Sequence, residues 1–297
     1  MPELPDVILY LESLQRLLQG RAINRVVLKS PFVLRTFDPP LDDVQGKIVG
    51  FSRIGKRIVW TLDSGIRLVF HLMIAGRFHW KKQPDRLPKS KLELMAFQFD
   101  HGTMMFTEAS KKKRASLHVV AADSSLESFE RGGLEVLEVS AEEFTTRLRQ
   151  QNRTLKRALT DPTIFSGIGN AYSDEILLAA GLSPLKRTGQ LNEGEATRLF
   201  EATVNTLRLW MERLREQNED RFPEKVTAFR PEMIAHGKFN QPCAHCGTAI
   251  QRIRYAENEC NYCPRCQTGG KLLADRSLSR LLKGDWPKTI DELEDNG

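Results

Sequence analysis

Four of the five cysteines form two closely spaced pairs near the end of the chain. Cys243 and Cys246 make the first pair, Cys263 and Cys266 the second, with two residues inside each pair and sixteen between the pairs. Such pairs form two tight knuckles that together offer four thiolates to one tetrahedral ion. The spacing predicts one structural Zn²⁺ per chain, which explains the pattern better than four incidental buried cysteines.

The fifth cysteine complicates the ligand set, because Cys260 also lies two residues before Cys263. We favour Cys263 with Cys266 as the second knuckle, since Pro264 and Gly247 suit the turns that the two knuckles require. Cys260 is then a thiol without a role in metal binding.

Three basic residues surround the first knuckle. Arg252 and Arg254 follow it on a predicted strand, and Lys238 precedes it. Cations on a hairpin of this kind suit contacts with phosphate or with the DNA minor groove. An ordinary solvated surface explains them equally well when this segment is considered alone.

A glycine pair opens a predicted helix in the middle of the chain. Gly167 and Gly169 precede Asn170, and they let the backbone approach a ligand closely. The helix N-terminus offers free N–H groups and a positive dipole end, which suits a phosphate. Lys156 and Arg157 strengthen that interpretation, and we expect Lys156 to contact phosphate. The alternative is an ordinary turn in which Asn170 is the N-cap.

The N-terminus carries a possible nucleophile. A proline at position 2 normally loses the initiator methionine, which leaves Pro2 with a free secondary amine whose pKa is near ~8. Such an amine can attack the aldehyde carbon of a sugar and form an iminium, with Glu3 as the adjacent acid. The alternative is that Pro2 and Pro5 simply begin a helix.

Local patterns predict the elements that position these residues. Residues 5–18 show helical periodicity, and short strands with tight turns follow up to about residue 120. The predicted strands are 48–51, 57–62, 67–71, 92–100 and 103–107. Helices are then predicted at 140–150, 154–159, 170–180 and 192–217, followed by a polar linker at 218–230. Strands first and helices later indicate an α+β multidomain protein with an antiparallel sandwich or barrel.

Composition narrows the class of protein. The 297 residues are 40% hydrophobic and carry a formal net charge of +6, which permits a core and is compatible with a polyanionic partner. We expect no signal peptide and no membrane span, because the start has no basic region and no run of about 18 apolar residues exists. Cysteines with metal spacing rather than a disulfide pattern predict a cytoplasmic location.

Taken together, the motifs resemble a known family. The segments MPELPDV, LTDPTIFSGIGNAYSDEILLAAGLSP, CAHCGTAI and YCPRCQ occur in the order typical of the formamidopyrimidine-DNA glycosylase / endonuclease VIII family. The resemblance covers essentially the whole chain and implies an N-terminal helix with an antiparallel β-sandwich, a helix–two-turn–helix domain and a zinc-finger β-hairpin. We place these at residues 1–125, 126–230 and 231–284, with an acidic tail at 285–297.

The resemblance also implies an activity. It indicates a bifunctional DNA glycosylase and abasic-site lyase of base excision repair, a nucleoid-associated monomer that acts on double-stranded or single-stranded damaged DNA. The target nucleotide is flipped out of the helix, Pro2 attacks C1′, and β- and δ-elimination cut the strand. Glu3 moves protons on the sugar, the strand lysine Lys56 and the helix residue Asn170 hold phosphates, and Glu175 gives structural support.

The chain departs from the family pattern at several positions. Asp6 replaces a glutamate, and Asn258 stands where the finger arginine is expected, so that role is either missing or passes to Arg252 or Arg254. The loop 108–114 has lysines in place of the arginine and phenylalanine that fill the gap left by the flipped nucleotide. Ile74 occupies the position of the remaining void-filling residue. These differences indicate a divergent branch, to which the lesion preference of the family is not carried over.

Two other functions fit parts of the pattern. A relative that binds damaged or branched DNA without cutting it would keep the glycine turn and the finger but would not need the amine of Pro2. A zinc-ribbon interaction protein would explain the cysteines and the basic charge, but not the segment MPELPDV.

Overall fold

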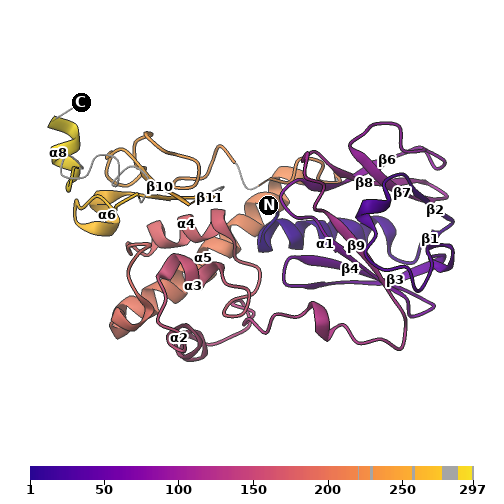
Figure 1. Ribbon diagram of the computed structural model, residues 1–297, viewed down its shortest axis with the longest axis horizontal. Coiled ribbons are helices and arrows are strands. Elements are labelled where there is room, and N and C mark those ends of the chain that lie inside the picture. The colour runs from indigo at the N-terminus through magenta and orange to yellow at the C-terminus, as the bar shows by residue number, and fades with distance from the viewer. Residues whose placement is uncertain (220, 228–229, 256–257, 276–286, 296–297) are drawn as a thin grey trace. The chain divides into compact units, whose positions relative to one another are not determined.

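The computed structural model describes residues 1–219, 221–227, 230–255, 258–275 and 287–295. The chain forms two compact units (Figure 1). The first contains Met1–Arg131 and Trp210–Thr227, and the second contains Gly132–Leu209 and Ala228–Gly297. The long helix α5, Glu193–Asn218, therefore contributes its first part to one unit and its last part to the other.

The first unit begins with helix α1, Leu4–Leu18, which confirms the helix predicted at 5–18. Val7, Leu14 and Leu18 recur at helical spacing and are fully buried, so this face of the helix packs on the sandwich core. Beyond the helix, Gly20 adopts a φ of +75°, a backbone conformation that glycine reaches without steric cost.

Strands β1 to β9 form the two antiparallel sheets of a sandwich. One sheet has the order β1-β3-β4-β5-β9 and the other β2-β7-β8-β6. The strands are β1 Ala22–Ile23, β2 Arg25–Leu28, β3 Gly46–Ile54, β4 Arg57–Leu62, β5 Arg67–His71, β6 Gly76–Lys81, β7 Glu93–Phe99, β8 Gly102–Glu108 and β9 Ser116–Val120. All five predicted strands are confirmed within one or two residues, apart from β3, which is longer at both ends.

Aromatic rings fill the space between the two sheets. Trp60, Phe70, Phe78 and Phe106 are fully buried, and neighbouring ring centroids such as those of Trp60 and Phe70 lie 4.9 Å apart. Contacts at this separation in tilted or edge-on geometry add to the free energy gained by burial. Short 3-10 turns connect the strands at Pro31–Val33 (η1) and Leu41–Asp43 (η2).

The second unit is helical in its first part, as predicted. It contains α2 Ala141–Arg149, α3 Leu155–Thr160, α4 Asn170–Ala179 and the start of α5, with a 3-10 turn at Thr188–Gln190 (η4). Another 3-10 turn, Glu127–Phe129 (η3), lies at the end of the first unit. The predicted capping pairs are present. Before α2, the backbone N–H groups of Ser140 and Glu143 each donate to the side chain of the other residue. Asn192 and Glu195 form the same pair of hydrogen bonds before α5.

The segment after α5 is not a solvated linker. Residues 221–227 have no helix or strand, but Val226 is only 1% exposed and belongs to the core cluster of the sandwich. Arg215, near the end of α5, also pairs with Glu12 of α1 at 2.6 Å. Val226 packs against residues that are distant from it in the sequence, and this burial outweighs the polar composition that suggested a linker.

A small zinc-ribbon hairpin completes the second unit. Strands β10, Gln251–Tyr255, and β11, Asn258–Tyr262, are antiparallel, and the short helix α6, Pro264–Thr268, follows. The described part of the acidic tail packs against the segment that follows α6. Ile290, at the start of α8 (Ile290–Asp295), is 1% exposed, and its N–H donates to the carbonyl of Gly270 at 2.8 Å.

Candidate active site and nucleic-acid surfaces

The N-terminus is largely buried in the first unit. Pro2 is buried, and Glu3 is only 2% exposed. Burial lowers the pKa of the N-terminal amine of Met1. Arg77 and Lys56 also lower it, against the opposing effect of the carboxylates of Glu3 and Asp6. An amine in this environment loses its proton more readily than an exposed one, and the unprotonated amine is the nucleophilic form.

A capping box fixes the position of the acid beside the amine. The carboxylate of Asp6 accepts the backbone N–H of Glu3 at 2.9 Å, and the carboxylate of Glu3 accepts the N–H of Asp6 in return. Asp6 is fully buried, so the shorter side chain still reaches its partner across the first turn of α1. The change from glutamate to Asp6 thus leaves the local geometry of the helix start intact.

The strand pairings gather several turns at one end of the sandwich, which we call the loop end. Ile54 pairs with Arg57, Arg57 with His71 and His71 with Ser116, so the turn at Lys56 lies at the same end as the start of β9. In the other sheet Gly76 pairs with Glu108. The loop end therefore consists of the turns 29–35, 55–56, 72–75 and 109–115 together with Ser90–Leu92, as the antiparallel register requires.

Two expected residues belong to this loop end. Lys56 lies in the two-residue turn between β3 and β4 rather than in a strand, because Gly55 at a φ of +59° turns the chain one residue earlier. Ile74 is 58% exposed on the turn before β6, and Arg77 donates to its carbonyl at 3.2 Å. The side chain of Ile74 is thus exposed to solvent. Its carbonyl is bound by Arg77, one of the cations that lower the pKa of the N-terminal amine.

His71 was not predicted as a functional residue, yet it lies at the same loop end. Burial lowers the pKa of His71 to about 4, and Arg57, Lys56 and His118 act in the same direction. Its Nδ1 accepts the backbone N–H of Met73 at 3.0 Å. The imidazole is therefore neutral near pH 7 and holds the turn that presents Ile74. The sequence signal that could have identified His71 is a histidine at the end of a predicted strand, directly before a turn.

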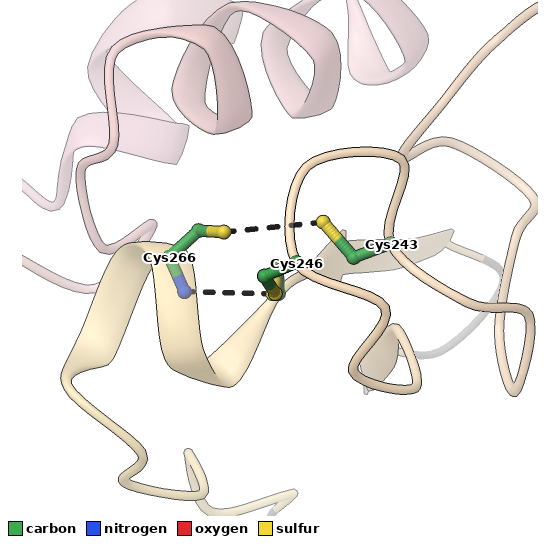
Figure 2. Close-up of side chains that lie close together, drawn as sticks. Cys243, Cys246 and Cys266 are labelled. Carbon is green, nitrogen blue, oxygen red and sulfur yellow. Dashed lines mark hydrogen bonds between the residues drawn. The ribbon is translucent and has the colours of Figure 1, made fainter.

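The four predicted metal ligands meet in the second unit. Their sulfur atoms all lie within 4.8 Å of one another, and the residues are Cys243, Cys246, Cys263 and Cys266. Figure 2 shows the labelled cysteines converging from the first knuckle and from the start of α6. Four thiolates at this separation suit the tetrahedral geometry of Zn²⁺. The chain thus holds one structural zinc. Cys260 lies outside this group, as expected.

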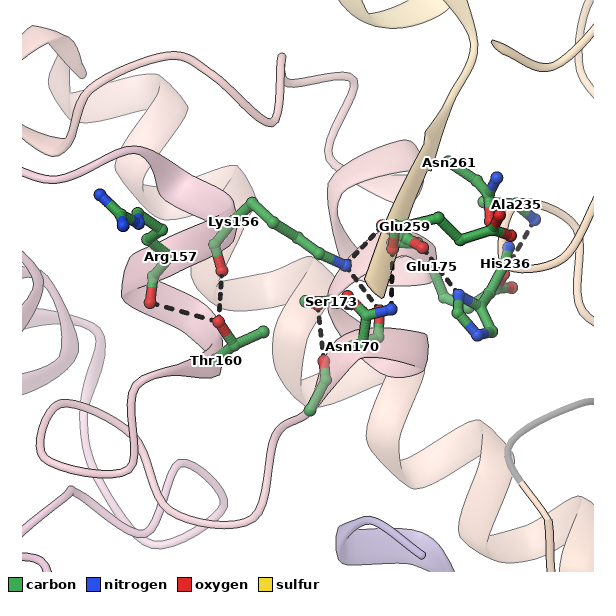
Figure 3. A network of polar contacts seen from close by, with 12 residues as sticks. Lys156, Arg157, Thr160, Asn170, Ser173, Glu175, Ala235, His236, Glu259 and Asn261 are labelled. Atoms are coloured by element: carbon green, nitrogen blue, oxygen red, sulfur yellow. Dashed lines mark hydrogen bonds and ion pairs between the residues drawn. The ribbon is translucent and has the colours of Figure 1, made fainter. Parts of the chain in front are cut away.

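Cys260 belongs instead to a buried polar network around Asp174. Figure 3 shows other members of this network, among them Lys156, Asn170 and His236. Asp174 is fully buried, and its carboxylate accepts from Lys156 Nζ at 2.5 Å and contacts His236 Nδ1 at 2.8 Å. Burial raises the pKa of the Cys260 thiol, and Asp174 raises it further. Glu175, next in sequence, accepts three backbone N–H groups from residues 234–236, which agrees with the structural role expected for it.

The expectation that Lys156 contacts phosphate needs correction. Lys156 is 9% exposed, and its ammonium is held by Asp174 and by the carbonyl of Asn170 at 2.6 Å. A buried cation paired in this way neutralises the carboxylate inside the protein instead of meeting a ligand. Arg157, which is exposed on the same helix, is the better candidate for a phosphate contact.

Substituting Lys156 by Met should therefore destabilise the second unit. The change leaves the carboxylate of Asp174 buried without its cation, which costs about 3–5 kcal/mol. Denaturant unfolding measures this loss, and Arg157→Met is the matched control, expected to change stability by less than about 0.5 kcal/mol. If Lys156→Met kept full stability and lowered the salt dependence of DNA binding by about one unit, the phosphate role would stand.

The glycine turn precedes α4 as predicted, but the N-cap residue of the helix differs from the one expected. Gly167 has a φ of +81°, and the N-cap of α4 is Gly169, so Asn170 is the first helical residue and not the N-cap. The amide of Asn170 donates to the backbone carbonyl of Glu259 on β11 at 2.7 Å. This bond ties the helix start to the finger hairpin, so the two candidate phosphate-binding elements are held together.

The finger cations differ in their surroundings. Arg252 lies over the ring of Phe239, 4.0 Å from its centroid, and pairs with Glu259 at 3.6 Å. Lys238 donates to the carbonyl of Pro231 at 2.8 Å. Arg254, in contrast, is exposed on β10. Of the two arginines expected near the position of Asn258, Arg254 is thus the more exposed.

Comparisons with known proteins identify three domains of one family along the chain. The formamidopyrimidine-DNA glycosylase N-terminal domain matches residues 1–114, and the H2TH domain of the same enzymes matches residues 135–219. The zinc finger found in FPG and IleRS matches residues 240–269. A formamidopyrimidine-DNA glycosylase of Desulfitobacterium hafniense is 30% identical over 280 residues, covering 90% of this chain and 100% of the relative.

Two further relatives show how the similarity is distributed. A formamidopyrimidine-DNA glycosylase of Listeria innocua is 26% identical over 276 residues, covering 90% of this chain and 100% of its own length. An uncharacterized formamidopyrimidine-DNA glycosylase-like protein of Mycobacterium tuberculosis is 38% identical over 152 residues, which cover 51% of this chain and 94% of that protein.

Solved structures share the fold. A point mutant of the Lactococcus lactis FPG, solved with Fapy-dG containing DNA, has a TM-score of 0.79 at 25% identity and covers 90% of this chain and 100% of its own. The Lactococcus lactis Fpg in complex with abasic site containing DNA gives a TM-score of 0.79 at 25% identity, with 90% and 99% covered.

The fold and site thus define a DNA-repair glycosylase with a structural zinc finger. The chain belongs to the formamidopyrimidine-DNA glycosylase family, in which abasic-site lyase activity is typical. Within the part of the chain that the structure describes, no helix has the length and apolar character needed to cross a membrane.

Proposed function

We propose that Pro2 is the nucleophile of a combined glycosylase and lyase reaction. The observation that carries the proposal is the buried N-terminus: Pro2 and Glu3 are buried, and burial, Arg77 and Lys56 lower the pKa of the amine of Met1, the residue before Pro2. Once Met1 is removed, the amine nitrogen of Pro2 attacks C1′ and the glycosidic bond breaks. The base leaves with a proton, and the sugar ring opens to an iminium.

Strand cleavage follows from the iminium. Loss of the proton at C2′ expels the 3′ phosphate in β-elimination, and a second proton loss expels the 5′ phosphate in δ-elimination. We assign the transfer of these protons to Glu3; the proposal is supported by the capping box that holds its carboxylate and by the effect of that carboxylate on the N-terminal amine. Lys56, on the neighbouring turn, supplies positive charge for the phosphate next to the lesion.

We assign the remaining DNA contacts to both units. Asn170 and Arg254, with Lys238 and Arg252 adding charge, are proposed to contact the backbone, and Ile74 is proposed to fill the space left by the flipped nucleotide. The known complexes contain Fapy-dG or abasic DNA. We propose damaged DNA of this kind, double-stranded or single-stranded, as the substrate of a monomer acting in the cytoplasm at the nucleoid.

The opposite base should matter little to this enzyme. The loop after β8 carries Lys111, Lys112 and Lys113, whose ammonium groups stack poorly and have no planar fork for reading a base. We expect excision rates of one lesion opposite each of the four bases to agree within about tenfold, or about 1.4 kcal/mol. Single-turnover excision on the four duplexes and on the single strand measures this.

The result also separates the competing functions. A strong opposite-base preference together with strict dependence on duplex DNA would show that another loop reads the orphan base. Tight binding without base release or strand cleavage on any lesion would instead identify a protein that binds damaged DNA without cutting it.

A further inference from the structure

An aromatic side chain stands exposed at the loop end of the sandwich. Phe32, in the η1 turn, is 72% exposed, whereas its neighbour Val33 is 1% exposed and anchors the turn in the core. A phenyl ring with this exposure contributes little to folding, and a large exposed apolar side chain often marks a binding surface. Leu92, 47% exposed, adds apolar surface at the same end.

Backbone contacts fix where Phe32 lies. Just before it, the N–H of Ser30 donates to the carbonyl of Leu94 at 2.9 Å. Just after it, Arg35 donates to the carbonyl of Leu117 at 2.9 Å. Phe32 therefore sits between the starts of β7 and β9, beside the loop 109–115 that enters β9.

The surroundings of Phe32 are cationic. Lys29, Arg35 and Arg114 are exposed, as are Lys89, Lys91, Lys111 and Lys112. The acids of the adjoining strands are buried and engaged. Glu93 binds Arg86 and two backbone N–H groups, and Glu108 accepts the N–H groups of Arg114 and Ala115. The exposed charge around the ring is thus positive and suits a polyanion.

A second exposed phenylalanine provides a contrast. Phe37 is 79% exposed, but the acids Asp38, Asp42 and Asp43 stand close to it in the sequence and are all exposed. The chain here runs parallel to β9, since Val119 donates to Thr36 Oγ1 at 2.6 Å two residues after the bridge of Leu34 with Leu117. Phe37 is therefore displaced from the loop end and lacks the cationic surroundings.

We propose that Phe32 and the cations around it bind an unpaired DNA strand, with a base stacked on the ring and phosphates near the lysines. Paired bases in a helix are stacked on each other, so only an unpaired base can offer its face to Phe32. The proposal rests on the proposed function for the choice of DNA as the polyanion. It adds an aromatic platform that the lysine loop itself lacks.

Binding of an undamaged strand tests this directly. The probe is a fluorescent oligothymidylate of about 12 nucleotides, compared with a fully paired duplex of the same length. Phe32→Ala should weaken binding of the single strand by roughly 5- to 100-fold and binding of the duplex by less than about twofold. Phe32→Trp should restore binding, and Phe37→Ala, the matched control, should stay within about twofold of the unsubstituted protein.

Equal weakening of strand and duplex, no effect of Phe32→Ala, or an equal effect of Phe37→Ala would overturn the platform. Because Phe32 is exposed, the variants should fold normally, and thermal unfolding checks this. Borohydride trapping with abasic DNA is measured on the same samples. Absence of trapping by the unsubstituted protein would contradict the role of Pro2 while leaving the test of strand binding intact.

Discussion

A protein that keeps an extension on its N-terminus should form no covalent adduct with abasic DNA in the presence of borohydride. The extension converts the amine of Pro2 into a tertiary amide, which cannot form an iminium. We expect lyase turnover to fall about ten-thousand-fold or more, or at least ~5 kcal/mol of transition-state stabilisation. Trapping on a denaturing gel and single-turnover strand cleavage measure the two effects.

The matched control carries the same extension at the C-terminus. It should trap DNA as the untagged protein does once Met1 is removed, which mass spectrometry verifies. Glu3→Gln provides a second comparison, since it keeps the amine but removes the carboxylate beside it. Full trapping by the N-terminally extended protein would rule out Pro2 as the nucleophile.

Loss of any one zinc ligand should unfold the finger. In so small a module the metal supplies most of the folding free energy, roughly 10–16 kcal/mol for isolated zinc-finger peptides. Cys243→Ser should therefore release the metal and weaken DNA binding, because the finger carries Arg252 and Arg254 and holds Asn170 through the carbonyl of Glu259. Metal analysis and fluorescence anisotropy with DNA give the two readouts.

Cys260→Ser is the internal control for this experiment. Cys260 lies outside the four-sulfur cluster and is 1% exposed next to Asp174. The variant should keep one zinc per chain, because a hydroxyl can replace the thiol in the polar network without touching the metal. Loss of zinc in Cys260→Ser, with retention in Cys266→Ser, would show that the second knuckle is formed by Cys260 and Cys263 and was assigned wrongly.

Local sequence patterns determined the secondary structure and the metal cluster. The helix over 5–18, the capping pairs before α2 and α5 and the four cysteines of the cluster all depend on residues close together in the chain. In such segments, periodicity, caps and knuckle spacing act over only a few residues, so the physical cause is visible in the sequence itself. The resemblance to the family rests on the same short motifs.

The tertiary structure decided the surroundings of the side chains. Lys156 looked like a phosphate ligand, but Asp174, eighteen residues later, binds its ammonium inside the protein. Polar residues 218–230 suggested a linker, yet Val226 is buried in the core of the sandwich. In both cases the decisive partner lies on another element, and no local pattern encodes burial against it.

The loop end of the sandwich shows the same division most clearly. Lys56, His71, Ile74 and the turn of Phe32 are scattered over the sequence, and each alone resembles an ordinary surface or strand residue. Antiparallel pairing of strands with a fixed register places them at one end of the same unit. The sequence determines which residue types are present, and long-range strand pairing brings them together on one surface.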